Sequence, residues 1–439
     1  MRASLQDRKA CIIGLGYVGL TLAVAMAEAG FEVCGIERSE AILDCVRDGR
    51  AHFTEAGLND HLAPIIQSGR LKVHDRIPDN DDSTIYVVTV GTPVGADKKT
   101  KLDAIKAVAG EVARVLKPDD LVVLRSTVRI GVSRDVVKPV LDATGVPYRL
   151  AFCPERTIEG KALEELVSLP QIVGGLDPAS AERAGAVFNA LTPEIVTVDS
   201  LEAAEMVKLV NNTHRDLSFA FANEVAAACE AVGVSAPAII RAANYMYPRG
   251  GVPAPGPVGG PCLEKDPYIL AEGLAAFDFT PQIALTGRIF NETLPARVAA
   301  TIRRISERDR LSVDKVAILG LAFKGRPETS DMRGSLAGPL ADAIRAAFPD
   351  VNLVGFDPVA DHAEARAAGI EPVGDLSEAF SGASVVVIQN NHASFKDLDF
   401  ARYAPMMAPG GFIYDLWAQN AGRALGLENI RYFSLGATA

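Results

Sequence analysis

The sequence predicts an α/β fold in which two Rossmann-like doubly wound domains are joined by a central helical domain with a long spine helix. Three observations predict it. A strand, a glycine turn and a helix open the chain, one helical pattern runs through its middle, and the alternation of strands and helices restarts near residue 313. A chain of 439 residues suits two or three domains, and we expect them at residues 1–198, 199–300 and 301–439.

The first domain is predicted from the opening stretch. Residues 9–14 have the pattern of a strand, residues 17–30 that of a helix and residues 31–37 that of a second strand. Further strand-like runs follow at residues 84–90 and 120–127, with helical stretches between them. This alternation predicts a parallel doubly wound sheet.

The central helix is predicted from Leu201 to about Ala231, with Gly233 placed for a C-terminal cap. Lys208, Asn212 and Arg215 follow one another at helical spacing and would form one polar stripe. Because apolar residues surround this stripe, we expect the helix to be buried and the stripe to face a site or a partner.

The last domain is predicted from strand-like runs that begin near residues 313, 351, 383 and 411, with a helix over 335–347. The stretch GLAFKG places Phe323 and Lys324 just after the first of these strands. The ring could stack on a base or pack on a sugar, and the ammonium could meet a phosphate. The alternative is a surface lysine after a buried phenylalanine.

Composition and charge exclude several classes of protein. Hydrophobic residues make up 49% of the chain and charged residues 23%, as in folded soluble proteins. No run approaches the roughly 18 apolar residues of a membrane span, and a net charge of -11 disfavours nucleic acid as a partner. The N-terminal stretch lacks the cleavage region of a secretory signal, so we expect a cytoplasmic protein. The six cysteines show no metal-ligand spacing, and no metal site is predicted.

The opening glycine turn predicts a dinucleotide site. Gly14, Gly16 and Gly19 form GxGxxG between a strand and a helix, and Glu37 closes the second strand at the expected distance. Its carboxylate would accept hydrogen bonds from ribose hydroxyls and repel a 2'-phosphate, which favours NAD. The neighbouring Arg38 is the feature that points toward NADP.

Other polar groups follow the ends of later strands. VGTP ends at Pro93 and STV contains Thr127, both at the edge where doubly wound sheets bind ligands, although each alone is typical of an ordinary turn. Glu155 and Glu159 are four residues apart, which on a helical turn would place both carboxylates on one face. A solvated acidic face is the alternative.

Cys262 is the strongest candidate for a nucleophile. It ends a loop rich in Pro and Gly, follows Gly259-Gly260-Pro261, and is expected at the start of a helix. The helix dipole and nearby Lys265 would both favour a thiolate, and Asp266 would lie one helical turn away. An inert core cysteine is the alternative, but core cysteines rarely lie in such a loop beside three charged residues.

The motifs together resemble the nucleotide-sugar 6-dehydrogenase family from end to end: GLGYVGL, VGTP, STV, CPERTIEG, AEMVKLVNN, GGPCLEKD and ILGLAFKG. The resemblance implies an NAD domain, a central helical dimerisation domain and a UDP-binding domain. It also implies that Cys262 is the catalytic nucleophile, that Lys208, Asn212 and Asp266 assist it, and that Thr127 and Glu155 manage water and protons.

The same resemblance implies two sets of binding residues. Those expected to contact NAD are Gly14, Gly16, Tyr17, Val18, Gly19, Glu37, Arg38, Thr92, Pro93, Thr127, Glu159 and Lys265. Those expected to contact a UDP-sugar are Glu155, Arg156, Lys208, Asn212, Arg215, Arg249, Gly259, Phe323 and Lys324.

Within the family, NNTHRDLSFAFANE resembles the branch that acts on UDP-N-acetylhexosamines. The implied reaction is oxidation of the sugar C6 hydroxyl of UDP-N-acetyl-D-mannosamine to a uronate, with two NAD consumed and a thiohemiacetal and a thioester on Cys262. UDP-glucose 6-dehydrogenase and UDP-N-acetylglucosamine 6-dehydrogenase are the alternatives. Pro261 and Gly334 depart from the pattern of the branch, and Lys265 is more usual in UDP-glucose enzymes. The resemblance also implies a homodimer or a higher homo-oligomer.

Two other classes remain as alternatives. A two-electron hydroxyacid dehydrogenase would share the Rossmann half and the helical Lys-x3-Asn pair, but it needs neither the cysteine nor a second nucleotide domain. A non-catalytic nucleotide sensor would tolerate the loss of Cys262 or Lys208, yet both residues are present.

Overall fold

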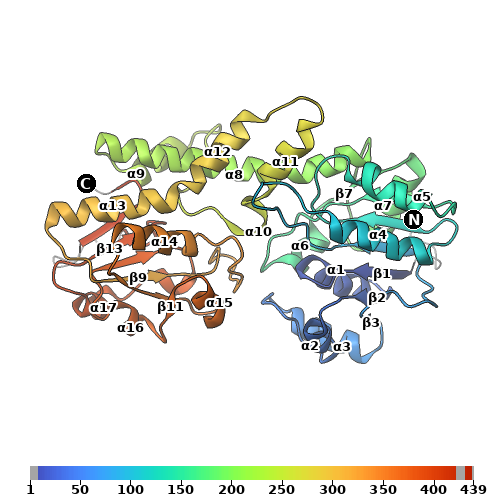
Figure 1. The fold of residues 1–439 in the computed structure, drawn as a ribbon, viewed down its shortest axis with the longest axis horizontal. Helices are drawn as coiled ribbons and strands as arrows, with labels where there is room; N and C mark the ends of the chain where they lie inside the picture. Colours follow the sequence, from blue (N-terminus) through green and yellow to red (C-terminus); the bar gives the residue numbers. More distant parts are fainter. Residues whose placement is uncertain (1–7, 422–430, 438–439) are drawn as a thin grey trace. The chain divides into compact units, whose positions relative to one another are not determined.

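The computed structural model describes residues 8–421 and 431–437 of the chain. The chain divides into two compact units, one made of residues 1–211 and 268–281 and the other of residues 212–267 and 282–439. Each unit contains one twisted sheet with helices packed on it (Figure 1). The two doubly wound sheets that the sequence predicts are therefore confirmed, while the three expected domain boundaries stay predictions.

The sheet of the first unit has the strand order β3-β2-β1-β4-β5-β6-β7-β8. Its strands are β1 Lys9–Ile13, β2 Glu32–Ile36, β3 Leu71–His74, β4 Ile85–Val88, β5 Leu121–Leu124, β6 Arg149–Phe152, β7 Gln171–Gly175 and β8 Ile195–Val198. All neighbours are parallel except β6 and β7, which are antiparallel, an exception to the parallel pattern predicted from the sequence. Ligands bind such sheets at the carboxyl ends of the strands, near the reversal of strand order between β1 and β4.

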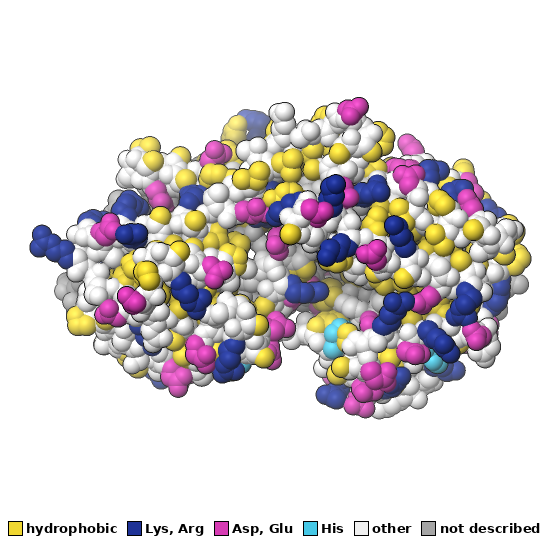
Figure 2. Space-filling model, viewed as in Figure 1, with side chains coloured by type: hydrophobic (Ala, Val, Ile, Leu, Met, Phe, Trp, Pro, Cys, Tyr) yellow, Lys and Arg dark blue, Asp and Glu magenta, His cyan; other side chains and the backbone are white. Residues whose placement is uncertain are grey.

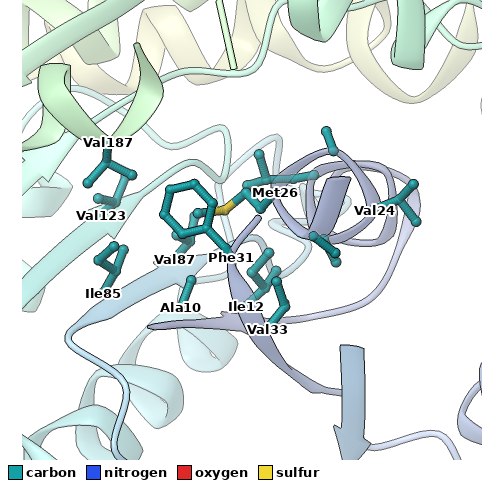
Figure 3. Packing of buried hydrophobic residues seen from close by; sticks show 14 of the residues in the cluster. Ala10, Ile12, Val24, Met26, Phe31, Val33, Ile85, Val87, Val123 and Val187 are labelled. Atoms are coloured by element: carbon teal, nitrogen blue, oxygen red, sulfur yellow. The ribbon is translucent and has the colours of Figure 1, made fainter. Parts of the chain in front are cut away.

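Helices cover both faces of this sheet, and its strands are therefore apolar on both sides. They are α1 Tyr17–Glu28, α2 Glu40–Arg47, α3 Leu58–Gln67, α4 Asp103–Val115, α5 Lys138–Asp142, α6 Ala162–Ser168 and α7 Pro178–Phe188, with a π-helical turn Ser133–Val137 before α5. Figure 3 shows one face of the core, where Met26 of α1 and Phe31 pack over Val87 of β4. Cys11 and Ile13 of β1 face the core on the opposite side.

The long helix is confirmed as α8, Leu201–Val232, and it runs from the first unit into the second. It ends where expected, because Gly233 adopts a left-handed φ of 81° and donates its N–H to the Cys229 carbonyl at 2.9 Å. Its exposed side chains include Met206, Val210 and Phe221, so the helix is less buried than the sequence suggests.

The sheet of the second unit is wholly parallel, with the order β11-β10-β9-β12-β13-β14. Its strands are β9 Lys315–Leu319, β10 Asn352–Phe356, β11 Glu371–Pro372, β12 Val385–Ile388, β13 Phe412–Asp415 and β14 Arg431–Ser434. The helices of this unit are α9 Ala236–Asn244, α10 Gly260–Leu263, α12 Gln282–Glu292, α13 Leu294–Asp309, α14 Ala337–Ala347, α15 His362–Ala367, α16 Leu376–Phe380 and α17 Phe400–Tyr403. The remaining helix, α11 Asp266–Ala275, begins in the second unit and continues in the first.

The surface shown in Figure 2 carries basic and acidic side chains interspersed with one another. Across the described part of the chain, none of the helices combines the length and the apolar character that crossing a membrane requires. The same residues contain no group of three or more His, Cys, Asp or Glu side chains placed to hold a metal ion.

Candidate active site

The glycine turn after β1 is shaped to receive a phosphate group. Gly14 has a φ of 95°, which favours glycine, and a Cβ on Gly19 would lie 1.8 Å from the Gly14 carbonyl oxygen. At Gly16, by contrast, a Cβ would meet no atom within 4 Å among the described residues beyond its own chain neighbours. The space beside Gly16 is therefore open at the start of α1, where backbone N–H groups favour an anion.

Glu37 lies beside this turn. Its carboxylate accepts hydrogen bonds from the backbone N–H groups of Leu15, Arg38 and Ser39 at 3.1, 2.8 and 3.0 Å. The guanidinium of Arg38 pairs with Glu111. An acidic partner therefore engages Arg38, whereas the carboxylate of Glu37 is held at the glycine turn through the Leu15 N–H, which fits NAD.

Tyr17 connects the glycine turn to the loop that follows β6. Its hydroxyl donates to the Glu55 carboxylate, and the same carboxylate accepts from the N–H groups of Gly160 and Ala162 at 2.6 and 2.7 Å. Burial, together with Glu55, raises the pKa of Tyr17. The neighbouring Val18 lies in the first turn of α1. Glu55 belongs to an irregular stretch with no motif, so sequence reasoning missed it.

The two predicted strand-end loops meet. The Thr92 hydroxyl donates to the Thr127 carbonyl oxygen, and the Ser126 hydroxyl donates to the Val90 carbonyl oxygen at 2.7 Å. Thr92, Pro93 and Thr127 therefore lie at the carboxyl ends of β4 and β5, on the ligand-binding edge of the sheet.

A second carboxylate, to which the sequence assigned no role, supports this edge. Glu205 of α8 accepts hydrogen bonds from the N–H groups of Gly131 and Ser133 at 2.6 and 2.9 Å and from the Ser133 hydroxyl at 2.7 Å. Burial raises the pKa of Glu205 to about 7, although these three donors oppose the shift. Glu205 thus anchors the segment that follows Thr127 to the central helix.

Glu155 is buried in a network of cations and N–H groups. Arg125 donates to its carboxylate through Nε at 3.1 Å and also bonds the Cys153 carbonyl and Gln171, while the Thr157 N–H donates to Glu155 Oε1 at 2.6 Å. Burial alone would raise the pKa of Glu155, but the charges of Arg125 and Lys208 and the Thr157 N–H outweigh it, so the pKa lies below its ordinary value. Glu155 is therefore ionised at neutral pH.

The structure has no helical turn that would place Glu155 and Glu159 on one face. Residues 153–158 are irregular, Glu159 and Gly160 form a turn, and α6 begins only at Ala162. The carboxylate of Glu155 bonds the N–H two residues later, which satisfies the backbone locally without a helix. Glu155 is buried and Glu159 half-buried, while Arg156 donates to the Pro170 carbonyl oxygen.

Lys208 and Asn212 lie one turn apart on α8, and both are buried. The Lys208 ammonium donates to the Glu155 carbonyl oxygen within the first unit. The Asn212 amide donates to the Asp266 carboxylate at 2.5 Å within the second unit. The third member of the predicted stripe, Arg215, is exposed, and the neighbouring Asp216 is buried. The role of Arg215 stays a prediction. Arg288 of α12 packs on this part of α8 and pairs with Asp216, which determines the buried face here.

Cys262 lies in α10 with its side chain exposed, in contrast to the buried Cys11, Cys153 and Cys229. α10 has only four residues, so the helix-dipole argument for a thiolate loses most of its weight, and α11 begins anew at Asp266. Lys265 lies half-buried in the turn between them.

The shape of the Cys262 loop requires its glycines. A Cβ on Gly259 would lie 2.1 Å from the Gly334 carbonyl oxygen, and one on Gly260 would lie 2.4 Å from the ring of Phe323. The Gly260 N–H donates to the Gly334 carbonyl oxygen at 2.8 Å. Phe323 therefore packs on the cysteine loop, and Lys324 Nζ lies 5.3 Å from the centre of its ring.

The departures at Gly334 and Pro261 have structural explanations. Gly334 has a φ of 64°, and a Cβ there would meet the Glu264 carboxylate at 2.2 Å. A larger acidic side chain would combine strain with repulsion. Pro261 lies in the first turn of α10, where its fixed φ is tolerated.

A cavity of about 540 Å³ lies within the second unit. Its lining comes from α9 and the two residues after it, from Val252, Ala254 and Pro255, and from the segment after β13. It includes Trp417, Tyr245 and the basic side chain of Arg241. Trp417 donates its indole N–H to the Gln389 carbonyl oxygen at 3.0 Å. Sequence reasoning missed Trp417, which it treated only as the end of a strand. The predicted Arg249 is exposed and stacks on Tyr247 with its guanidinium 4.7 Å from the ring centre.

Comparison with known proteins identifies the family. Residues 8–192 match the NAD-binding domain of the UDP-glucose/GDP-mannose dehydrogenase family, residues 202–293 its central domain and residues 317–420 its UDP-binding domain. The chain belongs to this family.

Individual members of the UDP-glucose/GDP-mannose dehydrogenase family match most of the chain. A UDP-N-acetyl-D-mannosamine dehydrogenase of Methanococcus maripaludis is 31% identical over 399 residues, which cover 89% of this chain and 88% of that protein. An NDP-N-acetyl-D-galactosaminuronic acid dehydrogenase of Ralstonia nicotianae is 31% identical, with coverage of 90% and 93%. The structure of a UDP-D-ManNAc dehydrogenase from Pyrococcus horikoshii superimposes with a TM-score of 0.87 at 28% identity and covers 98% of this chain and 99% of that one.

Family membership makes this chain an NAD-dependent oxidoreductase. The residues fit the cofactor, since the open space beside Gly16 suits a pyrophosphate and Glu37 suits a ribose. The match to the UDP-binding domain includes Phe323, Lys324 and Trp417. The 540 Å³ cavity is thus lined by residues of the central and the UDP-binding domains of the family.

Proposed function

We propose that this enzyme oxidises the C6 hydroxyl of a UDP-N-acetylhexosamine, with UDP-N-acetyl-D-mannosamine as the leading candidate, to the uronate in two steps that consume two NAD. The exposed thiol of Cys262 carries the proposal, because a two-electron alcohol dehydrogenase needs no nucleophile. The names of the relatives support an N-acetylated sugar.

In the first oxidation the alcohol loses its proton and the C6 carbon loses a hydride. Bound NAD accepts the hydride of each oxidation. The ammonium of Lys208 stabilises the developing alkoxide, and a water held by Asp266 and Thr127 takes up the proton. The Asn212–Asp266 hydrogen bond fixes the orientation of that carboxylate.

Cys262 acts in the second oxidation. Its thiolate adds to the aldehyde carbon to give the alkoxide form of a thiohemiacetal. This alkoxide loses the second hydride and becomes a thioester. Water then attacks the carbonyl carbon, the carbon–sulfur bond breaks, and the thiolate and the free uronate are released. Glu155 accepts the proton of that water, and Lys208 and Asn212 stabilise the oxyanion.

A panel of UDP-sugars tests the proposal. The enzyme should form two NADH for each UDP-N-acetyl-D-mannosamine consumed, with UDP-N-acetylglucosamine, UDP-N-acetylgalactosamine and UDP-glucose as weaker substrates. Turnover of UDP-glucose alone would move the assignment to UDP-glucose 6-dehydrogenase. A yield of one NADH per sugar would favour the two-electron class, and binding of UDP-sugars without NADH formation would favour the sensor.

We further propose that the nucleotide part of the substrate occupies the cavity beside Trp417. An aromatic ring next to a guanidinium suits a base and a phosphate. The chain contains one tryptophan, so its fluorescence reports on this cavity alone. UDP should quench that fluorescence, and Arg241→Gln should weaken UDP binding by about tenfold. Quenching that is absent at saturating UDP would place the nucleotide elsewhere.

A homodimer completes the proposal. Several apolar side chains of the second unit are largely exposed, including Val232 at 75% and Met246 at 85%, and a second copy of this chain would cover them. Sedimentation should show a dimer that Val232→Asp weakens, while Val196→Asp, at an exposed position of the first unit, should leave it intact. A stable and active wild-type monomer would contradict this. A cytoplasmic location stays a prediction.

A further inference from the structure

A buried arginine lies behind the loop that carries Cys262. Arg288 of α12 is 1% exposed and makes hydrogen bonds on two sides. It donates to the carbonyl oxygens of Leu263 and Val258 at 3.1 and 3.2 Å. These two residues flank Gly259-Gly260-Pro261-Cys262, so one guanidinium holds the loop at both ends.

The guanidinium is itself held by α8. Arg288 donates to the Asp216 carboxylate at 2.8 Å, and the Asn291 amide donates to the same carboxylate oxygen at 3.0 Å. The other carboxylate oxygen of Asp216 is buried and has no hydrogen-bond partner among the described residues. A buried carboxylate without a cation destabilises the folded state, so Asp216 and Arg288 stay paired in this geometry.

A second anchor holds the start of the same segment. Asn223 of α8 accepts from the Gly256 N–H at 2.9 Å and donates to the Gly256 carbonyl oxygen at 3.1 Å. Its amide also donates to Asn291 at 2.9 Å. The two anchors therefore form one connected network, and all its members belong to the second unit.

We propose that Arg288, oriented by Asp216 and Asn291, is a positioning residue that holds both ends of the Cys262 loop and so sets where the thiol meets the aldehyde. The reaction named here rests on the proposed function, whereas the clamp rests on the contacts alone. α10 has only four residues and cannot fix the position of the thiol by itself. A guanidinium that binds two carbonyl oxygens of the loop can do so instead. A misplacement of about 1 Å at a reacting atom costs roughly 100-fold in rate.

The test compares Arg288→Met, Arg288→Lys and Asp216→Asn with Arg303→Met as the control, because Arg303 pairs with Glu307 on the exposed side of α13. Hydrogen exchange of the peptide covering residues 256–264 is measured first, without substrate. We expect exchange to rise about tenfold in Arg288→Met and less in Arg288→Lys, with no change in the control.

The second measurement follows the two oxidations separately in the presence of an aldehyde trap. Arg288→Met should form aldehyde with an unchanged KM for NAD, but it should convert aldehyde to acid about 10 to 100 times more slowly. The aldehyde that is not converted should be released and captured by the trap. Arg288→Lys should recover part of the acid, since it keeps the charge and one donor. A role in folding alone would lower both oxidations together.

Three outcomes would overturn the clamp. Unchanged exchange in a folded Arg288→Met would show that the loop does not depend on the guanidinium. Raised exchange with wild-type acid formation would show that the loop moves without consequence for the thiol. If Arg288→Met does not fold, unchanged exchange in both Arg288→Lys and Asp216→Asn would likewise show that the loop does not depend on the guanidinium. If the wild type oxidises no UDP-sugar, the proposed function fails, and the exchange comparison still decides the clamp.

Discussion

The six strands of the second sheet follow the same order as β3-β2-β1-β4-β5-β6 of the first sheet, yet the first turns of the two sheets differ. In the first unit the turn that begins at Gly14 leads into α1 at Tyr17, whereas in the second unit the turn that begins at Gly320 reaches no helix until α14 at Ala337. Both glycines have left-handed φ values, 95° and 88°. The same frame therefore presents a helix N-terminus to a pyrophosphate in one unit and a long irregular segment in the other.

The carboxylates that follow the second strand of each frame differ in the same way. Glu37 accepts three backbone N–H groups and is half-buried. Asp357 is buried and accepts four, from Leu321, Ala322, Val359 and Ala360. Because four backbone N–H groups already donate to the Asp357 carboxylate, it can accept few further hydrogen bonds from ribose hydroxyls. The comparison teaches that the first turn is shaped for a dinucleotide, and that the second is shaped to present Phe323 to the cysteine loop.

The largest expected effect comes from replacing Cys262 in the second unit, which should stop acid formation without changing the first unit. Cys262→Ala should lower acid formation by about 10³-fold or more, because the aldehyde has no thiol to capture it, while NAD binding stays unchanged. Cys262→Ser should retain an adduct of substrate mass minus four hydrogens on residue 262, since an ester hydrolyses more slowly than a thioester. Mass spectrometry of the quenched variant and NADH counting in the wild type measure this. Two NADH per sugar from Cys262→Ala would refute the role.

The buried ion pairs of the two units should respond to pH in opposite directions. The pKa of Glu155 is lowered, so the stability that its pairing with Arg125 contributes is present above its ordinary pKa and is lost as the pH falls through the lower folded value. Burial raises the pKa of Asp216 to about 6; Arg288 and Asn291 oppose this shift and Glu292 adds to it. The folded state therefore holds this proton more tightly, and stability is lost as the pH rises from about 4 to about 6.

Denaturant unfolding at several pH values measures this contrast. Wild type should lose about 2 to 3 kcal/mol relative to Asp216→Asn between pH 4 and 6. Arg125→Met should cost about 3 to 5 kcal/mol at pH 7, because it leaves the Glu155 carboxylate buried without its cation. Parallel pH curves for wild type and Asp216→Asn would show that the carboxylate does not titrate in this range.

Matched glycine substitutions sharpen the comparison of the two turns. Gly16→Ala places a methyl group in open space, so the free energy of unfolding should stay unchanged while the Kd for NAD rises by about tenfold. Gly320→Ala places one 2.3 Å from the Asn390 side chain at a positive φ, so it should cost about 1 to 3 kcal/mol of stability. Calorimetry with and without NAD distinguishes the two. A loss of stability in Gly16→Ala would show that its turn is structural.

The smallest expected effect concerns the two carboxylates. Glu37→Gln should reduce the preference for NAD over NADP by about tenfold, since the charge that repels a 2'-phosphate is removed. Asp357→Asn should leave the preference unchanged and lower the thermal midpoint. Initial rates with both cofactors measure the first, and thermal unfolding measures the second. Equal use of NAD and NADP by the wild type would refute the role of Glu37.

The sequence predicts the conformation of some parts of the site but not of others. The GxGxxG turn and the loop of Cys262 were predictable, because each depends on glycines and neighbours within a few residues. The conformation at Glu155 could not be predicted, because a spacing of four residues does not show whether a helix forms. The Glu155 side chain bonds the N–H two residues later and satisfies the backbone without one. The buried position of Asp216 is not visible in the sequence, because the period of a helix does not show which element packs on it.

The sequence by itself determined the two doubly wound sheets, the long helix and the family. Periodicity, glycine spacing and motif order can all be read along the chain without knowledge of which distant residues are in contact. Only the tertiary structure decided which polar side chains support the site. Arg125 meets Glu155 across 30 residues and Arg288 meets Asp216 across 72. A buried charge is stable only with a partner, and folding alone brings such distant partners together. The sequence therefore assigns no role to Glu55, Glu205 or Arg288, although each holds a loop of the site.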